Sequence, residues 1–307
     1  MSLVELIDRF DSVQRSIVVV NRTEPDPIHN MLVDTFGDDS VDVIDQGSSG
    51  GDGRSTAGPF QSIETLLGDE PPSISVGDLR ESDAVSFDGD SLDDVTNLVL
   101  LLEGDEIVAA SPLAELVEAI LLVNSDLYVT GTRGLGDLDL PAVITGLDDT
   151  VFTLRGYPES NRQKLLLITI SRFIERVAWE SGAGTLRSSF QRLSRLDDEI
   201  GTRRVYRAVV DAGVDTHVYG YPDHRPDDLG AIVHAGDSAD FTDTWFVVYR
   251  PPEGARSVDG VDDDLRRGIE GGVALLAVEV EPRIWRGVWT FDPDRIRTVN
   301  EYIASNL

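Results

Sequence analysis

The sequence contains no cysteine, and Lys164 is the one lysine among its 26 basic residues. The absence of cysteine excludes disulfide bonds, thiolate metal ligands and cysteine nucleophiles. Long apolar runs are also missing, since none approaches the roughly 20 residues that a membrane-spanning helix needs. The first ten residues already carry three charged side chains, which predicts an amphipathic helix and not a signal peptide. We therefore expect a cytoplasmic protein with no membrane partner.

Negative charge dominates what is present. The 56 acidic residues, most of them aspartate, give the 307-residue chain a net charge of −30. Nearly every face would repel a phosphate backbone, so we expect no nucleic-acid partner. Self-repulsion at this charge weakens a compact state, but it is nearly abolished at about 1 M salt, where the screening length is about 3 Å. The excess of aspartate and the use of arginine over lysine resemble the composition of salt-adapted, archaeal cytoplasmic proteins. An ordinary acidic bacterial protein is the alternative.

The hydrophobic pattern of the first half predicts an N-terminal α/β module over residues 1–155. A Gly-, Pro- and acid-rich stretch at 47–83 predicts an acidic disordered insertion with one transient helical turn. Ser111 and Pro112 predict the N-cap and first residue of a helix that continues to residue 123. The other predicted elements are helices at 3–10, 27–36 and 140–146, and strands at 16–21, 41–45, 95–102, 107–110, 126–130 and 151–155.

The second half, residues 156–307, predicts an α+β module that begins with a long helix at about 160–180. Its apolar residues recur at spacings of three and four and so lie on one helical face. Further helices are expected at 186–196, 202–212 and 293–304, and strands at 215–219, 231–233, 245–249, 273–280 and 285–290. The segment 250–272 predicts a long acidic loop. The expected fold class is therefore α/β, with mixed sheets flanked by helices in two packed modules.

Several of these segments resemble the DICT sensory domain, in particular its haloarchaeal members. The similarity lies in residues 185–223, in 244–249 (TWFVVY) and in 287–293 (GVWTFDP). Residues 122–135 and 155–175 are also similar to those proteins. The resemblance implies a sensory-domain-like module that senses a ligand or a condition within signal transduction, beside cyclases and two-component proteins. It implies no reaction, no catalytic residue and no cofactor, and the chain lacks the kinase, cyclase or helix-turn-helix segment of multidomain members.

Motifs for chemistry are weak. The loop Gly131–Gly136 with Arg133 follows a predicted strand and could hold a phosphate, but its spacing fits neither phosphate-binding glycine motif, and a plain turn is the alternative. No G-x-S-x-G elbow accompanies the serines and histidines. Acidic turns at 88–91 and 262–264 lack the spacing of a calcium loop. The four histidines, His29, His217, His224 and His234, show no metal-ligand spacing. His224 and His234 flank a loop and could meet in space with Asp223 or Asp237.

One segment reverses the charge of the chain. Residues 162–207 hold ten basic side chains against five acidic ones. A basic island in an acidic protein predicts an interface, with the protein's own acidic module, with a second copy or with an acidic partner; a bound nucleotide is a further alternative. The arginines proposed for this interface are Arg172, Arg176, Arg187, Arg192 and Arg195.

Aromatic residues gather late in the chain. They are explained by core packing of the predicted sheet, but they could instead line a pocket for a planar or apolar ligand. The residues of that hypothetical pocket are Phe190, Gln191, Arg204, Tyr206, Trp245 and Trp289. We therefore expect a non-enzymatic sensory or regulatory protein that binds a small ligand, or a signalling protein such as a kinase or regulator, without cofactor or metal. The alternatives are a ligand-free interaction scaffold and an enzyme that acts on a phosphorylated metabolite through Gly131–Gly136.

Overall fold

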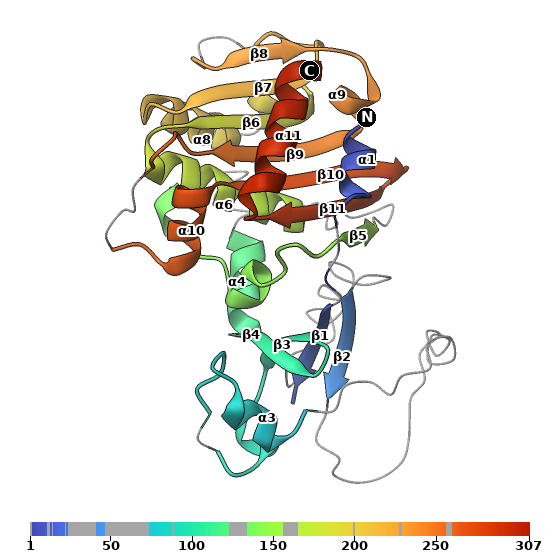
Figure 1. The fold of residues 1–307 in the computed structure, drawn as a ribbon, viewed down its shortest axis with the longest axis vertical. Coiled ribbons are helices and arrows are strands. Elements are labelled where there is room, and N and C mark those ends of the chain that lie inside the picture. Colours follow the sequence, from blue (N-terminus) through green and yellow to red (C-terminus); the bar gives the residue numbers. More distant parts are fainter. Residues whose placement is uncertain are drawn as a thin grey trace.

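The computed structural model describes most of the chain as two β-sheets with helices between and around them (Figure 1). The described residues are 2–10, 13, 15–21, 23, 41–46, 74–87, 89–122, 134–155, 165–198, 200–226, 229–255 and 260–307, of which 41–46, 120–122, 137, 155, 165, 198 and 200 are described by their backbone alone. The mixed sheets and flanking helices confirm the predicted α/β class.

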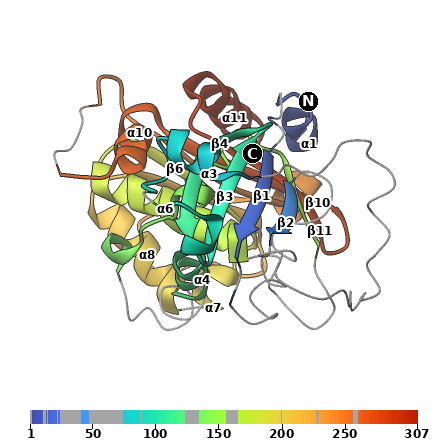
Figure 2. The same ribbon diagram turned by 90° about the horizontal axis from the view of Figure 1, so that it is seen from below.

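The smaller sheet has four strands in the order β2-β1-β3-β4. They are β1 (Arg15–Val20), β2 (Val41–Gln46), β3 (Leu98–Glu103) and β4 (Glu106–Pro112). β1 pairs parallel to β2 and antiparallel to β3, and β3 forms a hairpin with β4 from the strands predicted at 95–102 and 107–110. Valine and isoleucine dominate β1 because both faces of this strand are buried. Figure 2 shows the sheet from below, with α3 and α4 beside its strands.

The predicted disordered insertion is wrong at its C-terminal end. Residues 47–73 lie outside the described part of the chain, but residues 74–83 are ordered around α3 (Val76–Glu81). Ser75 forms a reciprocal capping box with Asp78, whose carboxylate accepts the Ser75 N–H at 2.7 Å. Ile74 and Leu79 are buried against the smaller sheet and supply the apolar contacts that hold this short helix.

The larger sheet has seven strands in the order β5-β11-β10-β9-β6-β7-β8. They are β5 (Phe152–Arg155), β6 (Thr185–Arg192), β7 (Asp215–Tyr221), β8 (Ile232–Ala235), β9 (Thr244–Arg250), β10 (Val273–Glu281) and β11 (Ile284–Thr290). β6, β7 and β8 pair in parallel, whereas every other neighbouring pair is antiparallel. β6 is therefore the strand at which the sheet changes from parallel to antiparallel pairing.

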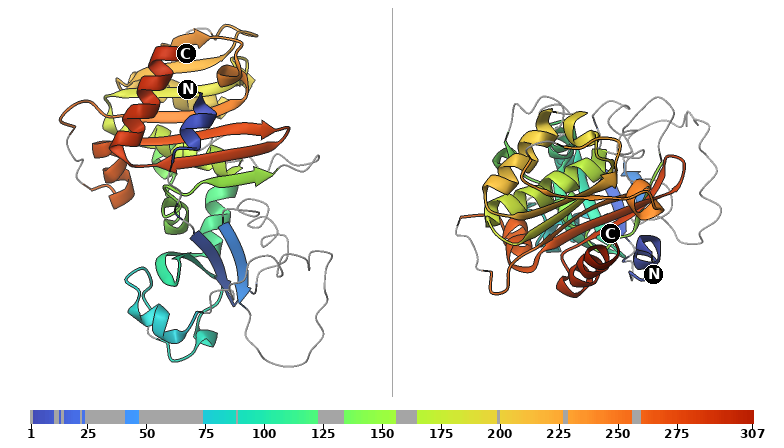
Figure 3. Two further views of the ribbon diagram at one scale, coloured as in Figure 1. Left: turned by 45° about the vertical axis from the view of Figure 1, so that its right-hand side comes forward. Right: turned by 90° about the horizontal axis from the view of Figure 1, so that it is seen from above.

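Helices cover both faces of the larger sheet (Figure 3). One face carries α1 (Leu3–Ile7) and α11 (Pro293–Asn306), and the other carries α6 (Leu165–Ser181) and α8 (Ile200–Asp211). The predicted apolar face of α6 is confirmed, because Leu166, Ile170, Phe173, Ile174 and Val177 are all buried. The shorter helices are α4 (Leu113–Leu122), α5 (Ala142–Thr145), α7 (Arg195–Asp198), α9 (Ala239–Thr242) and α10 (Asp263–Gly271).

The predicted helix at 186–196 is wrong, since residues 185–192 form strand β6. This strand pairs with β7 on one side and with β9 on the other, so its backbone groups are satisfied across the sheet. Leu186, Ser188 and Gln191 are buried among the strand residues, a pattern set by the neighbouring strands and by a bulge. Tertiary pairing thus overrides the helical interpretation of LRSSFQR.

Two helix starts also differ from the prediction. Ser111 and Pro112 end β4, and the Ser111 hydroxyl accepts a hydrogen bond at 3.2 Å from the N–H of Val143 at the start of α5. The expected acidic loop at 250–272 contains the helix α10. Asp262 caps the first turn of this helix by accepting the Leu265 N–H at 2.7 Å. The aspartates at 262–264 therefore begin a helix, where negative charge is favoured.

The two sheets share one hydrophobic core. Side chains of β1 and β3, such as Ile17 and Val99, belong to the same buried cluster as Phe173 of α6 and Trp289 of β11. β5 pairs with β11 and α1 packs on β10, so both ends of the predicted module 1–155 lie on the larger sheet. The change from one sheet to the other therefore falls before residue 152 and not at the predicted boundary after residue 155.

Candidate ligand-binding pocket

Strands β6 and β9 separate part of the way along the larger sheet. Their backbones pair over residues 185–188 of β6. Beyond residue 188, side chains of β6 form the hydrogen bonds to the β9 backbone. The Ser189 hydroxyl and the Gln191 side-chain amide donate to the Thr244 carbonyl at 2.8 and 2.7 Å, and the Ser189 hydroxyl accepts the Phe246 N–H at 3.3 Å. These bonds hold the two strands at a distance that main-chain pairing would not allow.

The local backbone of β6 adds to this separation. Its register with β7 shifts between Ser189 and Arg192, which is the signature of a β-bulge. Gln191 has φ +53°, a left-handed conformation that costs an L-residue about 1–2 kcal/mol. Gln191 is buried and its amide is bonded, so the surrounding structure holds the strained residue in place.

A pocket of about 330 Å³ lies where the strands part. It is at the carboxyl ends of the parallel strands β6 and β7, beside the start of β9, the end of β10 and the start of β11. Crevices at the carboxyl ends of parallel strands are the usual ligand sites of open α/β sheets. Its lining consists of Gln191, Arg192, Arg195, Tyr221, Thr242, Asp243, Glu279 and Trp285.

The pocket contains only one member of the predicted aromatic site, Gln191. Tyr206 and Trp289 are buried in the core, where Tyr206 packs edge-on against Phe190 and Trp289 packs with two phenylalanines. Arg204 is exposed on α8. Phe190 and Trp245 are half-buried and pack against the same core. The six residues therefore do not form one cavity, and the predicted apolar pocket is replaced by a polar one beside it.

Trp285 contributes the aromatic wall that the sequence did not indicate. Its ring meets that of Trp245 edge-on, with 6.4 Å between the centroids. The Trp245 indole N–H donates to the Ser171 hydroxyl of α6 at 2.9 Å. These contacts connect the Trp285 ring to α6, and Trp285 is itself buried, with 2% of its surface exposed.

Arg192 and Arg195 stand at the end of β6 and the start of α7. The Arg192 side chain is 63% exposed; it lies 3.6 Å from Asp223 and over the Tyr221 ring. Arg195 donates to the side-chain oxygen of Gln191. These two are the members of the predicted arginine interface that reach the pocket, and there they are partly available to solvent.

Asp223 fixes the turn between these arginines. Burial alone would raise its pKa, but hydrogen bonds from the backbone and hydroxyl of Ser194, together with the nearby Arg192, outweigh burial and lower the pKa below 3.8. Asp223 therefore stays ionised and holds the Ser194 turn at the end of β7.

The other predicted interface arginines are used inside the molecule. Arg172 is buried, ion-paired to Glu175 and bonded to Thr202 at 2.8 Å. Burial raises the pKa of Glu175, whereas Arg172 and the Tyr206 hydroxyl lower it. This network joins α6 to α8 and cannot form an exterior interface.

Arg176 and Arg187 are also tied to neighbouring elements. Arg176 donates to the Leu138 carbonyl and pairs with Asp139 at 2.7 Å, so it contacts the acidic N-terminal half, which is one of the predicted alternatives. Arg187 donates to the Tyr219 hydroxyl at 2.6 Å and to Asn300 of α11 at 2.9 Å. Both therefore support packing between layers.

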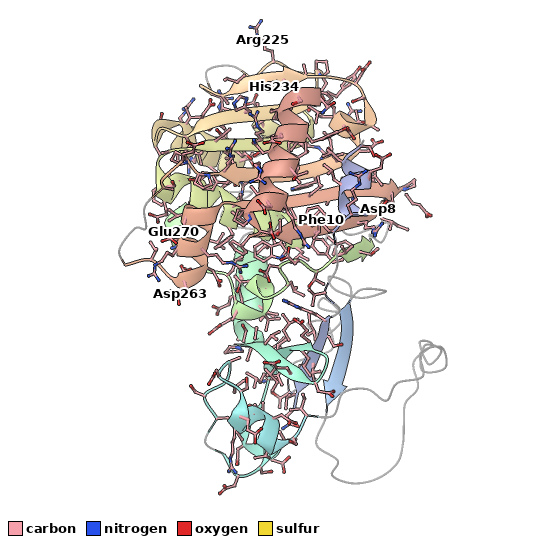
Figure 4. The ribbon with its side chains drawn as sticks, viewed as in Figure 1. Asp8, Phe10, Arg225, His234, Asp263 and Glu270 are labelled. Atoms are coloured by element: carbon pink, nitrogen blue, oxygen red, sulfur yellow. The ribbon has the colours of Figure 1, made fainter. Side chains whose placement is uncertain are left out.

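The histidines do not meet as predicted. His234, on the edge strand β8 (Figure 4), lies 2.9 Å from His217 and stacks on Tyr219, whereas His224 pairs with Asp197 at 2.8 Å. Burial, with smaller contributions from the neighbouring His217 and an arginine, lowers the pKa of His234. His29 lies outside the described residues. Within the described part of the chain, no group of three or more histidine or acidic side chains could hold a metal ion.

The predicted phosphate loop is only partly described. Residues 131–133, with Arg133, lie outside the described chain, and Leu135–Asp137 form a short 3₁₀ turn. The predicted strand at 126–130 and helix at 27–36 also lie outside it. In the acidic turn 88–91, Ser91 caps a second 3₁₀ turn at Leu92–Asp94.

Comparisons with protein-family models, with curated proteins and with solved structures found no match to this chain. Within the described residues, no helix combines the length and apolar character that crossing a membrane requires. The functional argument therefore depends on the pocket and the residues around it.

The sequence missed five lining residues: Tyr221, Thr242, Asp243, Glu279 and Trp285. The interpretation of 186–196 as a helix concealed the parallel pair β6 and β7 and with it the carboxyl ends at which a crevice is expected. Had that segment been taken as a strand, Tyr221 would have been a candidate. Glu279 and Trp285 reach the pocket through pairing with distant strands, for which no local signal exists.

Proposed function

We propose that the protein is a non-enzymatic sensory or regulatory protein that binds a small polar ligand in the pocket beside β6. The observation that carries this proposal is the half-enclosed cavity that the separation of β6 from β9 opens at the carboxyl ends of β6 and β7. The resemblance to DICT sensory domains in this same half of the sequence supports the same function.

Its connection to the helices suggests how binding would be transmitted. Arg192 and Arg195 flank the turn between β6 and α7, and α7 packs against α8. A ligand that contacts both arginines would change the orientation of this turn and hence the docking of α7 and α8. The ligand shifts such an equilibrium only by the difference in its affinity for the two states. A kinase or regulator would then bind the altered helical surface.

The chemistry of the lining favours binding over catalysis. Its charged and hydroxyl groups are suited to ion pairing and hydrogen bonding, and the lining holds no serine, cysteine or histidine for the common kinds of nucleophile–base pair. The enzyme alternative depends on Arg133, which lies outside the described residues. A binding protein is therefore the function that this geometry supports best.

The test is a ligand screen with a matched pair of variants. Thr242 lines the pocket and donates from its hydroxyl to the carbonyl four residues earlier, as Thr298 does on α11. Thr242→Phe should fill the pocket, whereas Thr298→Phe places the same bulk on an exposed helical position. Charged and polar metabolites would be screened at high KCl by the shift of the unfolding temperature.

At a concentration about 100-fold above Kd, a ligand should stabilise the wild type and Thr298→Phe by about 2.7 kcal/mol and leave Thr242→Phe unchanged. If no metabolite stabilises the wild type, or if Thr242→Phe responds equally, the proposal is wrong. A partner protein that co-purifies without any small molecule would then favour the scaffold.

A further inference from the structure

Four of the eight residues that line the pocket are charged, two of each sign. This balance is unusual for a chain whose net charge is −30. The arginines lie at the end of β6 and the start of α7, and the acids lie at the start of β9 and the end of β10. The lining is thus divided into a positive side and a negative side.

The positive side keeps charge that the protein neutralises only in part. Arg195 donates to a neutral amide, that of Gln191, and no carboxylate of the described residues lies within 4.0 Å of its guanidinium. Arg192 is mostly exposed and lies at the long distance of 3.6 Å from Asp223. A small anionic group could therefore bind both guanidinium groups without displacing a strong ion pair.

The negative side also carries charge that no ion pair within the described residues neutralises. The Glu279 N–H donates to the Asp243 carbonyl at 2.8 Å, which fixes the two acids beside each other. One Glu279 carboxylate oxygen accepts the Arg283 N–H at 2.6 Å. The exposed Asp243 carboxylate has no ion pair within the described residues. These carboxylates are free to accept a cationic donor.

Thr244 joins the two sides. Its carbonyl accepts bonds from Ser189 and Gln191 of β6, while the preceding residue, Asp243, belongs to the negative side. The spacing between the positive and negative sides is therefore set by the rigid separation of β6 and β9. A receptor with fixed charges of both signs discriminates by the distance between the charges of its ligand.

The charge of the whole chain further restricts the ligand. At low ionic strength, a simple anion is repelled by the overall field, and a simple cation is attracted to acidic sites everywhere on the surface. A molecule that carries one charge of each sign has no net interaction with the overall field and pairs fully only where both signs face it. The Trp285 wall can contact its uncharged part.

We propose, building on the function proposed above, that the pocket binds a small zwitterion of the amino-acid type. Its carboxylate lies between Arg192 and Arg195, and its ammonium group lies against Asp243 and Glu279. The uncharged remainder of the ligand packs against Trp285.

The test is calorimetric titration at high KCl with a matched series of probes: free L-amino acids, their N-acetyl derivatives, which lack the ammonium group, and their amides, which lack the carboxylate. At least one free amino acid should bind. Its two derivatives should each bind at least about tenfold more weakly, since each lacks one charge-assisted interaction.

Two variants locate the charges. Arg195→Gln and Asp243→Asn should each weaken binding of that amino acid at least about tenfold. Arg225→Gln and Glu270→Gln are the controls, because both residues are exposed and neither lines the pocket (Figure 4). The controls should bind as the wild type does, and the temperatures of unfolding of all four variants verify that they are folded.

The outcomes separate this inference from the proposed function. A ligand that carries a single charge and whose binding is abolished by Thr242→Phe would overturn the zwitterion and leave the binding function intact. An amino acid that binds as well after loss of either charge would do the same. If neither the amino acids nor the wider screen yields a ligand, both proposals are wrong.

Discussion

Two regions of the basic segment 162–207 use arginine in opposite ways. Arg172 is buried between α6 and α8 and is paired with Glu175, whereas Arg195 lies at the pocket and bonds to a neutral amide. Both belong to the same basic segment of the sequence. The difference shows that the basic residues of this segment fall into two groups, those paired inside the molecule and those that line the pocket.

The largest loss of stability should follow from breaking the buried ion pair between Arg172 and Glu175. Arg172→Met leaves the Glu175 carboxylate without its cation in the core, which should lower the free energy of unfolding by about 3–5 kcal/mol. Chemical denaturation at high KCl measures the change. The double variant Arg172→Met, Glu175→Leu should recover part of the loss, because it removes the unpaired charge. A cost below about 1 kcal/mol for the single variant would show that the pair does not support the core.

A smaller effect is expected in the pH dependence of the free energy of unfolding, and it arises from the Glu175 carboxyl group. Burial raises the pKa of Glu175 above 4.5, so the folded protein holds this proton more tightly than the unfolded chain. Its contribution is fully present below pH 4.5 and is lost as the pH rises through the folded pKa, by up to about 1.4 kcal/mol per unit. Glu175→Gln should abolish that contribution. Stability curves measured against pH for Glu175→Gln and for Glu180→Gln, a control on the same helix, should diverge from each other in this window.

His234 on the edge strand β8 should change the pH dependence of stability in the opposite direction. Burial lowers the pKa of His234 below 6.5, and His217 and Arg187 add to the shift. The folded protein therefore binds this proton less readily, and the free energy of unfolding should fall as the pH drops from 6.5 through the folded pKa. His234→Asn should remove this loss, with Tyr219 still in place beneath it. Equal acid sensitivity in variant and wild type would contradict the assignment.

The smallest effect on stability is expected at the pocket itself. Arg192→Gln should change the free energy of unfolding by no more than about 0.5 kcal/mol, because its side chain is mostly exposed. Arg195→Gln should cost about 1 kcal/mol, because it removes a hydrogen bond to the buried Gln191. Together with a loss of ligand binding, this result would complete the contrast with Arg172. A loss as large as that of Arg172→Met would assign the pocket arginines to structure.

Much of the fold could be predicted wherever a local pattern decides the structure. The valine-rich run of β1, the hairpin of β3 and β4 and the apolar face of α6 each follow from periodicity. The failures came where distant residues decide. Segment 185–192 has no strong period of its own and becomes a strand because β7 and β9 flank it. Ile74 and Leu79 order the end of an acidic stretch because the smaller sheet offers them an apolar face.

The candidate site was less predictable than the fold. The sequence indicates Arg192 and Arg195 through the basic segment and Gln191 through the nearby aromatic residues. It assigns the arginines to an interface and Gln191 to a pocket, and so does not place them together. Asp243, Glu279 and Trp285 reach the pocket only because β9, β10 and β11 assemble beside β6. Such neighbours are separated by tens of residues along the chain.

By itself, the sequence determined the class of the fold, most of its strands, the acidic character of the molecule and the presence of one basic segment. Only the tertiary structure decided which arginines are buried and which line a pocket, and where that pocket lies. The reason is that periodicity and charge act over a few residues along the chain, whereas a cavity exists only after separate strands have paired and then parted.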